Sequence, residues 1–93
     1  MGMRFYEECV LVAESIGALF SEEQRRRFAA CDTRELEQYH PSLGMWIRHH
    51  LLPHRPYLCS ALTVLGQTTP EEMAAYLIAF AHRYWKLKHA QLL

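Results

Sequence analysis

Apolar side chains recur at intervals of three and four residues along most of this chain, and sustained alternation of apolar and polar residues is absent. The first spacing is typical of amphipathic helices, whereas half-buried strands alternate with a period of two. Residues Met3–Phe20 carry the first such stripe, and residues from Pro70 to about Ala90 carry the longest. The first stripe consists of Phe5, Cys9, Val12, Ile16 and Leu19. This pattern predicts an all-α fold.

Residues that favour helix ends divide the chain between these two helices. Ser21–Gln24 and Thr69–Glu72 each match the capping box, in which two side chains bond the backbone amides at a helix start. Further start signals lie at Asp32 or Thr33, Pro41 and Pro56, and stop signals lie at Pro53 and Gly66. The sequence therefore predicts a compact bundle of about five helices, some of them short, with a long C-terminal helix.

The segment His40–Leu52 holds an unusual concentration of glycine, tryptophan and histidine, and its flanking prolines predict one short helix. Apolar residues at helical spacing are expected to face the core from it. These residues are Leu43, Trp46, Ile47 and Leu51.

Three other residues of this segment follow one another at four-residue steps and share one side of the helix: His40, Gly44 and Arg48. A glycine inside a helix costs about 1 kcal/mol relative to alanine, so Gly44 indicates close approach of another helix or of a ligand. His40 and Arg48, together with His82, form the basis of an alternative in which the protein is a small hydrolase or nuclease. A structural role is the competing interpretation, in which Arg48 pairs with an acid from the first half of the chain.

The last helix presents a broad apolar face. Its predicted stripe is Met73, Leu77, Phe80, Tyr84 and Leu87, widened by Ala74, Ile78 and Trp85. A helix this broadly apolar packs on two sides, so we expect it to be central in the bundle or shared with a partner.

The composition describes one globular domain of 93 residues, with 51% hydrophobic and 22% charged residues. Its formal net charge is zero, but residues 1–45 carry a net charge of −3 and residues 46–93 a net charge of +3. Two interpretations fit this asymmetry. Either the halves attract each other within the fold, or a polarised surface receives a charged partner.

Cysteine and histidine spacing argues against a bound metal or cofactor. The three cysteines lie far apart without a paired motif, which is typical of reduced thiols in a cytoplasmic protein. His50 and His54 have the spacing of helical metal ligands beside His49, but Pro53 ends the helix between them. We predict no metal, no cofactor, no signal peptide and no membrane span.

Basic and aromatic residues are interleaved near the end of the chain, from His82 to His89. Nucleic-acid binders place such residues on one surface, so a weak nucleic-acid binder is a further alternative. It would use Arg83, Trp85, Lys86 and Lys88. The zero net charge argues against nucleic-acid binding. In the competing interpretation, Trp85 is an anchor in a protein contact or in the bundle itself.

The segment HPSLGMWIR at His40–Arg48 resembles a family of small uncharacterised bacterial domains built on a His-x-x-Leu-Gly-x-Trp-Ile-Arg segment. Residues Leu65-Gly66, Pro70-Glu71-Glu72-Met73 and His82-Arg83-Tyr84 follow in the order typical of that family. The resemblance covers residues 39–86 and leaves residues 1–38 unplaced.

Where the family usually continues with asparagine and a tryptophan-glycine step, this chain has His49-His50-Leu51-Leu52-Pro53. The resemblance implies a bacterial, cytoplasmic, all-α domain without an assigned activity. It also marks a set of signature residues, namely His40, Leu43, Gly44, Trp46, Arg48, His82 and Arg83.

These observations favour a non-catalytic helical module that binds another protein or a second copy of itself, and a narrower form is an immunity or antitoxin-like protein. The candidate binding residues are His40, Gly44, Arg48, His82, Arg83 and Trp85.

Overall fold

The computed structural model describes residues 2–90, and every regular element in that range is a helix. The elements are α1 (Met3–Ala18), α2 (Glu22–Ala30), α3 (Thr33–Leu36), η1 (Glu37–Tyr39), α4 (His40–Trp46), η2 (Ile47–Leu51), η3 (Leu52–His54), α5 (Pro56–Val64) and α6 (Pro70–His89). The predicted all-α fold with a long C-terminal helix is confirmed.

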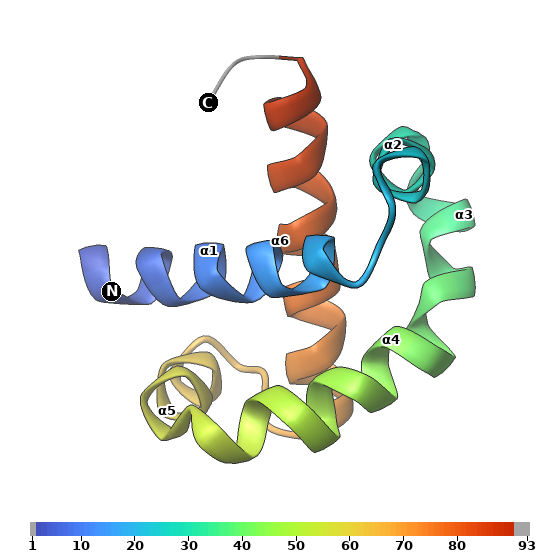
Figure 1. Ribbon diagram of the computed structural model, residues 1–93. Helices are drawn as coiled ribbons and strands as arrows, with labels where there is room; N and C mark the ends of the chain where they lie inside the picture. The colour runs from blue at the N-terminus through green and yellow to red at the C-terminus, as the bar shows by residue number, and fades with distance from the viewer. Residues whose placement is uncertain (1, 91–93) are drawn as a thin grey trace.

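Helix α6 occupies the middle of the molecule. Figure 1 shows α1 crossing it, α2 beside its C-terminal half and α4 near its N-terminal end. The same three helices make the main packing contacts with α6. Of the two roles predicted for this helix, the structure therefore shows the central one.

The buried face of α6 is rotated from the predicted stripe. Its buried residues are Met73, Ala74, Leu77, Ile78, Ala81 and Trp85. Phe80, Tyr84 and Leu87 were expected at the centre of the stripe, but they lie at one edge and are only partly buried. The buried face is set by the packing of α1, α2 and α4 on α6, which the pattern within α6 alone does not specify.

Trp85 fills the junction between α1 and α6. It is 8% exposed, and its indole Nε1–H donates a hydrogen bond of 2.8 Å to the carbonyl oxygen of Ala13. The ring lies directly against Gly17, where an added Cβ atom would overlap it. Gly17 therefore marks close helix packing.

The local signals at helix ends are confirmed. Ser21 with Gln24, Asp32 with Glu35, and Thr69 with Glu72 form reciprocal capping boxes. Gly66 has a φ of 94° after α5. The amides of Gly66 and Gln67 bond back to carbonyls of the last turn, as in a Schellman motif.

The segment His40–Leu52 is less regular than predicted. The α-helical hydrogen bonding of α4 ends at Trp46, a π-helical turn covers Ile47–Leu51, and a 3-10 turn follows. Pro53 explains the change, because its nitrogen has no hydrogen to bond the carbonyl of His49 and its ring displaces that carbonyl. Leu43 and Ile47 are buried as predicted, whereas Trp46 and Leu51 are only partly buried.

Candidate functional site

The candidate trio His40, Gly44 and Arg48 lines one open cleft between α4 and α6, of about 290 Å³. Its other lining residues are Pro41, Glu71, Ala74, Ala75 and Ile78. The prediction from four-residue spacing that these three residues share one surface is therefore confirmed. The facing wall comes from α6, which sequence spacing alone did not identify.

Arg48 pairs across this cleft with Glu71, whose Oε1 lies 3.6 Å from the guanidinium Nη1. The prediction that Arg48 pairs with an acid from the first half of the chain is therefore wrong. Glu71 sits in the first turn of α6, and its side chain is 69% exposed compared with 28% for Arg48. A single contact of this length leaves most guanidinium donors free for another acceptor.

Gly44 forms part of the wall of the cleft. A Cβ atom at this position would come no closer than 4.0 Å to Ala74, which is ordinary contact. The packing of α4 on α6 therefore does not require glycine here, and the missing side chain instead leaves the cleft wider.

The structure separates His82 from this cleft. Its Nε2–H donates a 2.7 Å hydrogen bond to the carbonyl oxygen of Cys31, and its ring packs edge-on against Phe28. His82 thus joins α6 to the end of α2. The predicted catalytic combination of His40, Arg48 and His82 is not assembled.

The basic and aromatic residues of the last helix do not share a surface either, because successive helical residues are turned by about 100°. Arg83 lines a small groove with Tyr6 and Phe80, whereas Lys86 lines a cleft facing α2. Trp85 is buried in the bundle, so it is unavailable as a surface anchor. The residues predicted to bind nucleic acid therefore lie on different surfaces or in the core.

Lys88 belongs to a polar cluster between α6 and α1. Its Nζ lies 3.0 Å from Glu14, and the Tyr84 hydroxyl also donates to Glu14. The hydrogen bond from Tyr84 and the ammonium of Lys88 lower the pKa of Glu14, whereas burial and the bond to Glu14 raise the pKa of Tyr84. The Glu14–Lys88 and Glu8–Arg55 ion pairs join the acidic and basic halves, as in the first of the two interpretations of the charge asymmetry.

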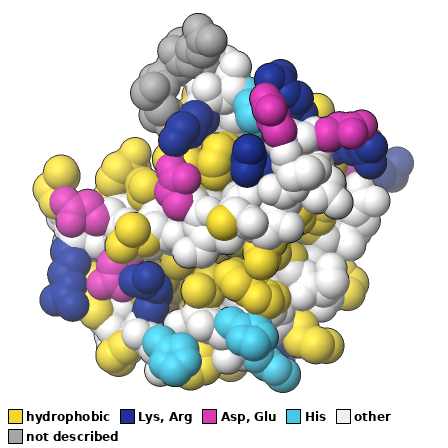
Figure 2. Space-filling model, in the orientation of Figure 1, with side chains coloured by type: hydrophobic (Ala, Val, Ile, Leu, Met, Phe, Trp, Pro, Cys, Tyr) yellow, Lys and Arg dark blue, Asp and Glu magenta, His cyan; other side chains and the backbone are white. Residues whose placement is uncertain are grey.

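A second surface was not predicted from the sequence. An apolar groove of about 190 Å³ runs between the end of α1 and the η1–α4 segment, lined by Leu19, Phe20, Tyr39, Ser42, Leu43 and Trp46. Figure 2 shows hydrophobic atoms gathered between α1 and α4, with histidines below them. Leu19 was expected in the core but is 46% exposed. The groove depends on the tertiary structure, which brings the residues after α1 beside the η1–α4 segment.

Within residues 2–90, no group of three metal-ligating side chains is placed to hold an ion. His49, His50 and His54 are exposed. No helical stretch in the same range combines the length and apolar character needed to cross a membrane.

The fold and clefts define a small all-α domain built on a central C-terminal helix. The chain belongs to the family described as Domain of unknown function (DUF6794), whose model matches residues 7–85. This match extends well before residue 39 and includes most of α1 and all of α2. The first helices therefore belong to the family domain. No match was found among curated proteins or among solved structures.

Proposed function

We propose that this protein is a non-catalytic interaction module that binds a second protein chain through the apolar groove between α1 and α4. The observation that carries this proposal is the partly exposed Trp46 in that groove. Leu19, which lines the groove directly after the end of α1, is 46% exposed. Tryptophan surrounded by apolar side chains is typical of the residues that dominate binding energy at protein interfaces.

The polar side chains favour binding over catalysis. His82 is engaged by a backbone carbonyl, and Arg48 is paired with Glu71. His40 and Arg48 lie about 12 Å apart along the helix axis, from the rise per residue. One proton-transfer step needs groups much closer together.

A short apolar groove bounded by helices suits the apolar face of another helix. The bound chain is a second copy of this protein or a different protein, as the sequence predicted. The narrower form, an immunity or antitoxin-like protein, stays a prediction. We also propose a cytoplasmic location, supported by three cysteines that form no disulfide.

The groove is tested by charge substitution at its exposed rim. We expect Leu19→Glu to weaken association, measured by light scattering for self-association and by tryptophan fluorescence for binding to proteins encoded by neighbouring genes. Trp46 reports on the groove, while the buried Trp85 is an internal reference.

Val64→Glu is the matched control, because Val64 is 77% exposed at the end of α5 and outside the groove. The proposal is wrong if wild-type protein stays monomeric at high concentration and binds none of the neighbouring gene products. It is also wrong if Val64→Glu disrupts association as strongly as Leu19→Glu.

One observation favours a second candidate, a small hydrolase or nuclease. His40 and Arg48 do line a common cleft with Glu71, which adds a carboxylate that the sequence had not connected to them. A phosphodiester assay with a chromogenic substrate tests it. Turnover by the wild type that His40→Gln abolishes and His50→Gln retains would support catalysis, and equal background rates would exclude this substrate class.

A further inference from the structure

The cleft between α4 and α6 combines two opposite charges with an apolar wall. Arg48 is the last of its lining residues before α5, and Glu71 is the first on α6, so both charges lie at one end. The rest of the lining is mainly apolar and includes Pro41, Ala74, Ala75 and Ile78. A volume of about 290 Å³ is at the lower end of the range for small-molecule sites. The cleft therefore has room for a small ligand with a polar end and an apolar end.

The ion pair at the polar end leaves both partners available to a ligand. Its single contact of 3.6 Å is longer than an ordinary charge-assisted hydrogen bond of about 2.7–2.9 Å. The neighbouring acid, Glu72, accepts hydrogen bonds from the backbone amides of Thr68 and Thr69 at the start of α6. The Glu71 side chain is instead 69% exposed, so it is free to turn toward another cation.

From this arrangement we propose that the cleft binds a free α-amino acid with an apolar side chain, such as leucine. The α-carboxylate accepts hydrogen bonds from the Arg48 guanidinium, and the α-ammonium donates to the Glu71 carboxylate. An amino acid carries both groups on one carbon, so it matches two opposite charges that already lie side by side. An acid without the ammonium is repelled by Glu71, and an amine without the carboxylate is repelled by Arg48.

The apolar side chain of the ligand lies beside Gly44. This residue is one turn before Arg48, about 6 Å away along the helix axis. The missing side chain leaves space there, since an added Cβ atom would have no neighbour closer than the Cβ atom of Ala74 at 4.0 Å. Burial of a short aliphatic chain against this wall contributes the hydrophobic part of the affinity.

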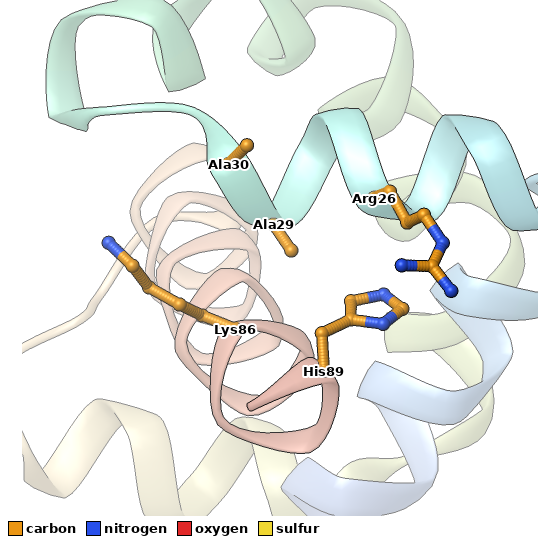
Figure 3. A pocket seen from close by; sticks show the side chains of 5 residues that line it. All are labelled: Arg26, Ala29, Ala30, Lys86 and His89. Atoms are coloured by element: carbon orange, nitrogen blue, oxygen red, sulfur yellow. The ribbon is translucent and has the colours of Figure 1, made fainter. Parts of the chain in front are cut away.

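The other large cleft on α6, which faces α2, lacks this arrangement. Figure 3 shows its Lys86 side chain pointing away from Arg26 and His89, so its charged groups do not converge on one ligand. Its volume is about 300 Å³, and no acid is among its lining residues, which are Arg26, Ala29, Ala30, Lys86 and His89. Of these two clefts, the one between α4 and α6 therefore suits a zwitterion.

Amide NMR of the full chain, titrated with L-leucine at constant pH and ionic strength, tests the proposal. We expect leucine to shift the signals of residues 40–48 and 71–78. Arg48→Gln and Glu71→Gln should each weaken leucine binding about tenfold, the loss expected for one charge-assisted hydrogen bond. Gly44→Ala keeps both charges, and its methyl group should weaken leucine binding about fourfold by taking the space of one methylene.

Three analogues separate the parts of the ligand. Isocaproate lacks the ammonium group, leucinamide lacks the carboxylate, and free glycine lacks the apolar side chain. Each should bind more weakly than leucine. Equal binding of isocaproate would overturn the proposal in favour of a simple carboxylic acid. Equal binding of leucinamide would overturn it in favour of the N-terminal residue of a peptide.

Arg26→Gln and Glu22→Gln are the matched controls, because they remove the same charges from an ion pair outside the cleft. The proposal is also overturned if leucine shifts no signals in the cleft, or if these controls weaken binding as much as Arg48→Gln and Glu71→Gln. Association through the α1–α4 groove is independent of these outcomes, because the groove and the cleft share no lining residue.

Discussion

The indole ring of Trp85 lies against the backbone of Gly17, in space that a side chain on residue 17 would need. The same indole donates its N–H to the Ala13 carbonyl one turn earlier in α1. These two contacts fix how α1 crosses α6. They also explain a glycine that helix propensity alone would disfavour.

Replacing Gly17 with alanine should destabilise the protein. Alanine favours a helix by about 1 kcal/mol over glycine, but the added methyl group would overlap the Trp85 ring. Overpacking of this kind costs about 1–3 kcal/mol. We expect a lower midpoint of urea unfolding, and an unchanged or higher midpoint would contradict the close packing of the two residues.

Replacing Gly44 with alanine should have the opposite effect. The new Cβ atom would lie 4.0 Å from Ala74 and would clash with nothing. The free energy of unfolding should therefore rise by up to about 1 kcal/mol. Because the chemical change matches Gly17→Ala, the two variants form a controlled pair. A loss of stability in Gly44→Ala would show that α4 and α6 approach too closely to leave 4.0 Å between the new Cβ atom and Ala74.

The Glu14 cluster should make stability depend on pH. The hydrogen bond from Tyr84 and the charge of Lys88 lower the pKa of Glu14 from its ordinary value of 4.5. A lowered pKa in the folded state means that Glu14 contributes stability above pH 4.5 and loses it as the pH falls through the lowered pKa. Because Glu14 is 43% exposed, this contribution should not exceed about 1 kcal/mol.

Urea unfolding of Glu14→Gln and wild type, measured across the acidic range, tests this dependence. The difference between the two proteins should be present at neutral pH and should vanish at strongly acidic pH. Glu37→Gln is the control, because Glu37 is exposed and forms no ion pair in the described part of the chain. If the stability difference between Glu14→Gln and wild type persists at the lowest pH, the effect of Glu14 comes from packing and not from its charge.

Cys9 should resist alkylation in the folded protein. It is fully buried, and burial together with the nearby Glu8 raises its pKa to about 11. Since the thiolate is the reactive form, both effects slow the reaction at neutral pH. Mass spectrometry after iodoacetamide treatment should find the partly exposed Cys59 modified first and Cys9 only after urea is added. Equal rates for these two thiols would show that α1 opens readily.

Local signals predicted the helix boundaries well because each depends on a few neighbouring residues. The capping box of Thr69 and Glu72 needs only one turn of chain to form, and so does the stop at Gly66. The rotation of α6 could not be predicted in this way. Whether Trp85 or Tyr84 faces the core depends on where α1 crosses, which a single helix does not determine.

The candidate site was likewise predicted only as far as local spacing determines it. Four-residue spacing placed His40, Gly44 and Arg48 on one side of a helix, and they do line one cleft. Glu71 is more than twenty residues away in sequence, so its pairing with Arg48 depends on tertiary structure. The α2–α6 cleft with His89 likewise combines residues about sixty positions apart.

The central position of α6 has a consequence for synthesis of the chain. Helices α1, α2 and α4 all bury their apolar faces on it, yet they are translated before it exists. A nascent chain that ends before Pro70 therefore has no surface on which to order these helices. The domain should fold cooperatively only after α6 has left the ribosome, with its apolar faces open to chaperones until then.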